Sequence, residues 1–485
     1  MRRSSFGQDV GEGAPRPGSG AASGTRGALQ AGGGPIAVAA VLAAMTLVVL
    51  DAGMTNIAMP TLAVALDLSP ATVVLVVTVY QTVLLVGLFP SAALGERFGY
   101  RRVFAAGAWL FVIGSGACAL APSLPWLIAA RGLQGLGGAA IMALGVPLLR
   151  FAVSPARLGA AIGWNALTVA LAFSAGPGVG ALILSNAGWP WLYAANIPIG
   201  VVVIAACRWL PSTPAGSQRL DGPSLFLSAS MFASLFIGAQ IFLARPVWAG
   251  GLVLSGILCL GLLIRREAPK PAPVIPLDLL RERSLRLSAV ASVLCFAGQG
   301  AAMGALPFYL QQGLGQSTAE TGVYMTAWPV AVAVSSIAAS RLAEKMSTAR
   351  LCAIGGGMLA SGLLGAALWP MVGDLRPMLL FTAMCGVGFG LFQTPNNRNL
   401  FLSAPLERSA ASGGLQGAAR LTGQTSGAVL LTVFLTLTPV AIAPRFGLAA
   451  AAFLALAAAL VSLAREQGPD QAKRRDGWRK LFARP

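Results

Sequence analysis

The sequence predicts an all-α membrane protein with about fourteen transmembrane helices, arranged as two six-helix halves with a two-helix insert between them. Three observations support this fold class. The chain has 485 residues, of which 56% are hydrophobic and only 10% charged, whereas a soluble domain is about 25% charged. Apolar runs long enough to cross a bilayer recur along the chain. Basic residues gather between alternate runs, as they do in cytoplasmic loops.

The apolar runs define the elements in chain order. Residues 1–35 are rich in Gly, Ser, Pro and Arg and lack the apolar core of a signal peptide, which predicts a disordered cytoplasmic tail. The first half, 36–210, contains predicted spans at 36–58, 71–92, 103–121, 125–148, 158–184 and 191–210. A linker and two inserted spans, 224–244 and 247–265, occupy 211–285. The second half, 286–465, contains spans at 287–310, 322–342, 351–370, 377–397, 411–436 and 446–464, and a basic cytoplasmic tail covers 466–485.

The basic residues set the orientation of these spans. Of the 34 Lys and Arg residues, only Arg245, Arg376 and Arg445 fall on the side opposite the N-terminus, and only Arg131 and Arg420 lie within spans. This bias predicts a multi-pass protein of the cell inner (plasma) membrane with both termini in the cytoplasm. Because the net charge of +18 lies in short tracts between apolar runs, a nucleic-acid partner is not expected.

The composition also argues against several kinds of site. The chain has no histidine, and its six cysteines lie in or beside apolar runs without a CxxC pair. Neither a metal site nor a disulfide framework is therefore predicted. The sequence shows no nucleophile–base set and no nucleotide-binding loop. We expect no enzymatic activity, no cofactor and no use of ATP.

An internal repeat relates the two halves. The loops LGERFGYRR and LAEKMSTAR pair Glu96 with Glu344 and Arg97 with Lys345. Duplicated halves with a site between them are the plan of secondary transporters. Acid and base in one short turn can clasp neighbouring helix ends, whereas a single such loop would more simply anchor the chain at the cytoplasmic surface. The second copy favours a gating role, which we assign to Glu96, Arg97, Gly99, Arg101, Glu344 and Lys345.

Among the 16 acidic residues, only Asp51 lies well inside a span. An ionisable group at membrane depth costs roughly 2.5–3.5 kcal/mol on insertion scales and usually has a function. Arg131 lies at a similar predicted depth, so the two are expected to form a pair that couples proton movement, or alternatively a purely structural ion pair. Arg420 has no acidic partner in the spans of its own half. It is expected to bond backbone carbonyls, to line a cavity or to extend toward the interface.

Other polar and aromatic side chains within the spans are candidates for lining a substrate cavity. Together with Arg420, they are Asn56, Tyr80, Gln81, Gln134, Asn165, Gln299 and Asn396.

These motifs resemble those of the major facilitator superfamily, and most closely its fourteen-helix drug:proton antiporter branch. The first-helix motif is present at Asp51, Asn56 and Pro60, with Gly53 in place of a threonine. The fourth-helix Arg-x-x-Gln-Gly motif is intact at Arg131. The first gating loop departs from the family pattern at Ala92, Glu96 and Tyr100.

Two further signatures support the resemblance. The antiporter motif of the fifth helix is kept at Gly163, Gly176, Pro177 and Gly180, although Ala172 and Ala181 replace glycines. In this family these residues serve helix packing in exporters. The Trp-x-Trp…Asn-x-Pro-x-Gly signature of the branch is kept at Trp189, Trp191, Asn196, Pro198 and Gly200.

The resemblance implies a major facilitator fold and a monomer that exports small, lipophilic, drug-like compounds in exchange for protons by alternating access. Its partners would be the small-molecule substrate, protons and the lipid bilayer. One alternative is a proton-coupled uptake carrier of the same fold. Another is a non-transporting membrane sensor or scaffold, but such a protein would not need an acid at membrane depth or paired gating loops.

Overall fold

The computed structural model describes residues 34–466 apart from 213–219, 271–272, 274–275, 277, 344, 371–374, 404–408 and 440. This part of the chain folds into helices and contains no strand. Residues 1–33 and 467–485 of the two predicted terminal tails, and Glu344 of the second gating loop, lie outside the described residues. The all-helical fold class is therefore confirmed.

The helices that form the first half pack mainly on one another. They are α2 (Gly34–Ala65), α3 (Pro70–Val73), α4 (Leu75–Phe98), α5 (Tyr100–Ala119), α6 (Leu124–Ala152), α7 (Pro155–Asn186), α8 (Pro190–Ala194), α9 (Asn196–Ala206) and the 3₁₀ turn η1 (Cys207–Trp209). Helix α2 lies against α6, α7 and α9, and α6 lies against α4 and α5.

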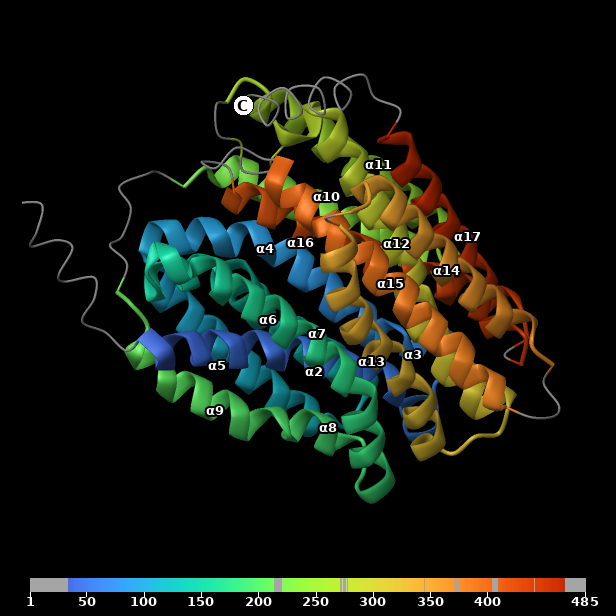
Figure 1. Ribbon diagram of the computed structural model, residues 1–485. Coiled ribbons are helices and arrows are strands. Elements are labelled where there is room, and N and C mark those ends of the chain that lie inside the picture. The colour runs from blue at the N-terminus through green and yellow to red at the C-terminus, as the bar shows by residue number, and fades with distance from the viewer. Residues whose placement is uncertain are drawn as a thin grey trace, which may run out of the picture.

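The second half repeats this packing. It consists of the 3₁₀ turn η2 (Leu279–Arg281), α12 (Arg283–Phe308), the π-helical turn η3 (Tyr309–Gly313), α13 (Thr318–Leu342), α14 (Thr348–Leu368), α15 (Arg376–Ser403), α16 (Ser409–Leu437) and α17 (Ala443–Ala464). Helix α12 lies against α16 and α17, and α15 lies against α13 and α14. In Figure 1 these helices, drawn yellow to red, lie beside the blue-to-green helices α2–α9.

Three helix pairs join the halves. Helix α7 packs along α13, α4 along α16 and α2 along α12. At the α2–α12 contact, the Gln311 side chain donates a hydrogen bond to the backbone oxygen of Ile57 over 3.4 Å. A Cβ added to Gly322 of α13 would lie 2.4 Å from the Cβ of Ala181 on α7. The two halves therefore make close contact where α2 and α12 end.

The insert is a helical hairpin of α10 (Gly222–Ile241) and α11 (Pro246–Glu267). Helix α10 packs on α4 and α16, at one of the seams between the halves. The ring of Phe232 stacks on that of Phe89 with centroids 6.4 Å apart. The insert therefore covers a seam that must change shape if the halves move.

A charged cluster closes one end of this hairpin. Asp221 caps α10 and accepts hydrogen bonds from Arg266, at 2.9 Å, and from Lys270. Lys270 and Ser224 also donate to the buried carboxylate of Glu267. Partial burial acts to raise the pKa of Asp221, but the hydrogen bonds from Lys270, Arg266 and Ser224 outweigh it and hold that pKa below its usual range.

Twelve helices in the described part of the chain are long and apolar enough to cross a membrane. Helices α7 and α16, which correspond to the predicted spans 158–184 and 411–436, are not among them. Within α7 the apolar segment found among the described residues is Leu171–Asn186, and α16 carries polar side chains such as Arg420 and Gln424 that line a cavity. The predicted count of fourteen spans is therefore not confirmed.

Candidate functional site

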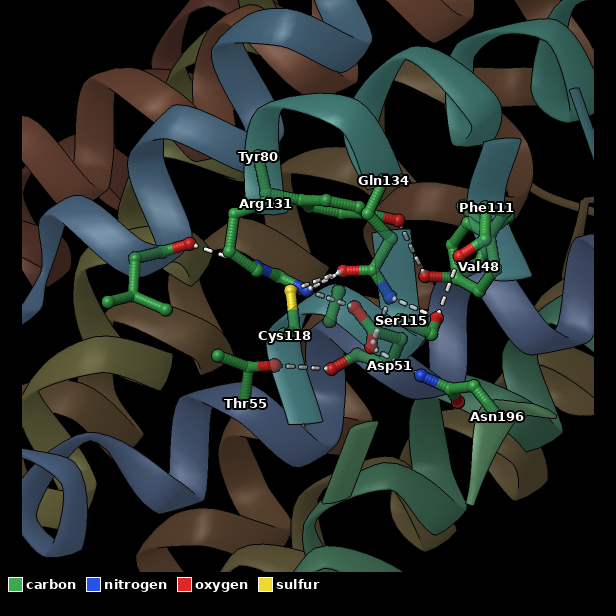
Figure 2. Close-up of polar contacts among 12 residues, drawn as sticks. Val48, Asp51, Thr55, Tyr80, Phe111, Ser115, Cys118, Arg131, Gln134 and Asn196 are labelled. Carbon is green, nitrogen blue, oxygen red and sulfur yellow. Dashed lines mark hydrogen bonds and ion pairs between the residues drawn. The ribbon is translucent and has the colours of Figure 1, made fainter. Parts of the chain in front are cut away.

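Asp51 lies in the middle of α2, and its side chain is 1% exposed. Its Oδ2 accepts a hydrogen bond from Nη1 of Arg131 at 2.6 Å. Its Oδ1 accepts from Gln134 Nε2 at 3.0 Å and from Asn196 Nδ2 at 2.7 Å. Figure 2 shows these donors converging on the carboxylate from α6 and α9. Both oxygens of the Asp51 carboxylate are therefore satisfied by donors from other helices.

Arg131 is fully buried on α6, yet most of its polar atoms are engaged. Besides Asp51, it donates to Gln134 Oε1 at 2.6 Å and, through Nε, to the backbone oxygen of Val76 at 3.1 Å. The guanidinium carbon lies 4.1 Å from the ring centroid of Tyr80 and 5.4 Å from that of Tyr193. A buried ion pair is tolerated only when further hydrogen bonds and contacts of this kind satisfy both partners.

Gln134 connects the pair to α5. Its amide nitrogen donates both to Asp51 and to Ser115 Oγ, the latter at 2.9 Å, and Ser115 donates to the backbone oxygen of Phe111 at 2.8 Å. Neither Ser115 nor the contact of Asn196 with Asp51 is predicted by the sequence. The available signal was that Asn196 is the one amide in the otherwise apolar segment NIPIGVVVIAA.

The predicted packing motif of α7 lies against the helical turn that follows Asp51. A Cβ added to Gly176 would lie 2.8 Å from the Cα of Gly53, and a Cβ added to Gly180 would lie 2.8 Å from Ile57. Pro177 lies beside Gly53 and also faces Gly322 of the second half. Gly53, which replaces the threonine of the family motif, therefore permits the close crossing of α2 and α7. Gly163 lies earlier in α7.

A cavity of about 50 Å³ lies between the two halves and is lined by α2, α4, α12 and α16. Five of the predicted cavity residues line it: Asn56, Tyr80, Gln81, Gln299 and Arg420. Tyr80 faces the cavity on one side and Arg131 on the other, and its hydroxyl donates to the backbone oxygen of Val48 at 3.2 Å. Its ring therefore separates the cavity from the Asp51 site.

Three residues predicted to line the cavity do not do so. Gln134 is withdrawn into the Asp51 site. Asn396 faces α12, where it donates to Ser292 Oγ at 2.7 Å and accepts from Arg465 Nη1 at 2.9 Å. Asn165 is buried on α7 outside the cavity lining. Sequence spacing shows that a residue lies in a span, but the rotation of the helix decides which neighbour that residue faces.

The predicted gating residues that the structure describes lie in or beside the turns that join α4 to α5 and α13 to α14. Gly99, with φ +95°, ends α4 and begins α5, a backbone conformation that favours glycine. Glu96 and Arg97 are exposed in the last turn of α4, and Lys345 is exposed in the turn between α13 and α14. Arg101 lies in the first turn of α5. Within the described residues, no group of three His, Cys, Asp or Glu side chains could hold a metal ion.

The family model of the Major Facilitator Superfamily matches residues 41–420 and 288–485. The chain belongs to this superfamily. It is 38% identical over 456 residues, 90% of the chain and 97% of the relative, to the uncharacterized transporter YebQ of Escherichia coli. It is 28% identical to the riboflavin transporter RibZ of Clostridioides difficile, covering 75% of this chain and 80% of that protein.

A third relative is the tetracenomycin C resistance and export protein of Streptomyces glaucescens, 28% identical over 82% of this chain and 75% of that protein. Among solved structures, a peptide transporter of the POT family in complex with sulfate superposes with a TM-score of 0.67 at 16% identity, covering 88% of this chain and 94% of that one. These comparisons make the chain a multi-pass membrane transporter with the major facilitator fold.

The crossing of α2 and α7 gives a first prediction. Gly176→Ala places a methyl group against the backbone of Gly53, so the helices must separate, at a cost of about 1–3 kcal/mol. We expect a lower melting temperature in detergent and weaker transport. Gly250→Ala is the matched control, because a Cβ there meets no atom within 4 Å. An unchanged melting temperature for Gly176→Ala would contradict the close crossing.

Proposed function

We propose that this transporter is a proton-driven exporter of small lipophilic compounds, of the drug:proton antiporter branch, with both termini in the cytoplasm. The observation that carries the proposal is the sealed Asp51–Arg131 site beside a cavity that both halves line. A single ionisable carboxylate at this depth has the properties of a proton carrier. The names of some relatives, such as the tetracenomycin C resistance and export protein, support the outward direction.

The geometry supports a coupling mechanism in which proton and substrate compete. The ionised carboxylate is stabilised by Arg131, Gln134 and Asn196. A proton on Asp51 removes the charge that holds Arg131, which frees the guanidinium to shift against Tyr80. Because Tyr80 also lines the cavity, a bound substrate can push the Tyr80 ring, and with it Arg131, back toward Asp51. The return of Arg131 then favours release of the proton from Asp51. Rocking of the two halves would then expose each state to opposite sides of the membrane.

The role of Asp51 is tested by Asp51→Asn, which keeps the shape of the side chain but cannot ionise. We expect lower thermal stability, because Arg131 loses its counter-charge. We also expect loss of uphill, pH-driven transport in proteoliposomes, whereas downhill exchange of substrate continues. Asp51→Glu, which can still ionise, should keep part of the uphill transport.

Measuring uphill and downhill flux on the same preparation separates loss of coupling from misfolding. A variant with Asn at position 51 that concentrates substrate at the wild-type rate would rule out the proton-carrier role.

The position of Tyr80 gives a further prediction. Tyr80→Ala removes the ring that separates the cavity from Asp51, so protons should leak through the protein without substrate. Tyr80→Phe keeps the ring and loses only the hydrogen bond to Val48, so it should remain coupled. Decay of an imposed pH gradient across proteoliposomes, followed with a trapped pH indicator, measures the leak. Equal decay for the two variants would show that the ring is not the barrier.

A further inference from the structure

One charged side chain lines the cavity between the halves, the guanidinium of Arg420 on α16. No carboxylate is among the described residues that line this cavity. Arg420 takes part in none of the five ion pairs found in the described part of the chain, and it has no hydrogen bond there. Arg131, in contrast, has a carboxylate at 2.6 Å. Arg420 is thus a cation between the halves without a protein anion.

The carboxylate of Asp51 is not available to Arg420. Asp51 is 1% exposed, lies behind the ring of Tyr80 and already accepts three hydrogen bonds. A guanidinium without a protein anion at membrane depth is costly, and such groups in membrane proteins commonly bind a ligand or line its pathway. An anion that enters the cavity would remove this cost, and arginine is suited to carboxylate because of its planar set of donors.

A second polar group faces the same cavity without a partner. Gln81 of α4 is 8% exposed, and its Oε1 is buried with no hydrogen-bond donor nearby. An unsatisfied buried acceptor costs about 1–3 kcal/mol, which a donor on a ligand would recover. The other three amides are less available, since Asn56 Nδ2 donates to the backbone oxygen of Ala52 at 3.0 Å and Gln424 Nε2 donates to Gln299 Oε1 at 3.3 Å.

The other side chains that line the cavity determine which ligand shapes it can accommodate. Met59, Met142, Met303 and Phe173 supply apolar walls, and methionine side chains adapt to varied shapes. The cavity of about 50 Å³ is smaller than the pockets of about 300–1,000 Å³ that hold drug-sized ligands. A ligand therefore requires the seam between α4 and α16 to open. Because Gln81 and Arg420 lie on these two helices, one ligand bound to both would join the halves.

We propose that the transported compounds are apolar monoanions that also carry a hydrogen-bond donor, with the anionic group bound by Arg420 and the donor bound by Gln81. This inference rests on the proposed transport function and names its substrate class. Cations, and dications above all, are repelled by the guanidinium in the absence of a lining carboxylate.

Equilibrium binding to the purified full-length protein tests the proposal without any gradient. Two naphthalene probes of equal shape are titrated calorimetrically at neutral pH, 6-hydroxy-2-naphthoate and its neutral carboxamide. We expect the carboxylate to bind roughly tenfold more tightly, since hydrogen bonds to charged groups exceed neutral ones by about that factor. Equal affinities, tighter binding of the carboxamide or no binding of either probe would overturn the proposal.

Variants assign the preference to its residues. Arg420→Gln should reduce the ratio of the two affinities to about one, and Arg420→Lys should keep part of it. Gln81→Leu should weaken the preference for 6-hydroxy-2-naphthoate over 2-naphthoate, which lacks the hydroxyl. Arg350→Gln is the matched control, because Arg350 is 62% exposed and pairs with Glu466 at the surface. If Arg350→Gln abolished the preference as Arg420→Gln does, the assignment to the cavity would be wrong.

The outcome is independent of proton coupling. A carboxylate preference that depends on Arg420, found in a protein that shows no pH-driven flux, would refute the proposed antiport but not the anion site. Uphill transport of neutral compounds, with equal affinity for the two probes, would refute the anion site but not the proposed antiport.

Discussion

The buried ion pair of Asp51 and Arg131 is the constraint on which the rest of the first half depends. Removing two charges from water costs several kcal/mol for each ion, and this cost is offset only if donors reach the carboxylate and acceptors reach the guanidinium with good geometry. Five helices meet here for that purpose: α2, α4, α5, α6 and α9. Their backbones approach closely because small residues stand at the crossings. At Gly114, for example, a Cβ would lie 2.7 Å from the backbone nitrogen of Gln134. The glycines in these helices are therefore needed to bring the polar side chains within hydrogen-bonding distance of the ion pair.

The two halves share their packing but not their chemistry. Along the repeat that pairs Glu96 with Glu344, Asp51 corresponds to Gln299 and Gly53 to Ala301. After a three-residue insertion in the second half, Gly176 corresponds to Gly427. A Cβ added to Gly427 would lie 2.6 Å from the backbone nitrogen of Ala301, so the same close crossing recurs between α12 and α16. At this position the first half carries the carboxylate of Asp51, whereas the second half carries the amide of Gln299, which lines the cavity. Under the proposed function, this asymmetry assigns the proton to the first half and the substrate to the cavity between the halves.

Sequence reasoning predicted the helical class, the repeat and the pairing of Asp51 with Arg131, because these depend on composition and on depth along a helix. It could not predict rotation about the helix axis. It therefore placed Gln134 and Asn396 in the cavity, although each bonds within its own half. Ser115 was missed because a lone serine in an apolar helix usually bonds only its own backbone. The three alternatives for Arg420 also depended on rotation, and the structure places it on the cavity. The polar side chains with which α16 lines the cavity also lower its mean hydropathy, which is why it is not among the twelve apolar helices.

The central claim is that Asp51 exchanges a proton during transport although it is sealed from solvent and held by Arg131. Infrared difference spectroscopy of the purified protein across a pH titration tests this most directly, because a protonated carboxyl group has a carbonyl stretch that a carboxylate lacks. We expect a band for one buried carboxyl group that appears within the pH range in which a gradient drives transport and that is absent from Asp51→Asn. If Asp51 remained ionised throughout that range, the ion pair would be purely structural and the account of coupling would be wrong.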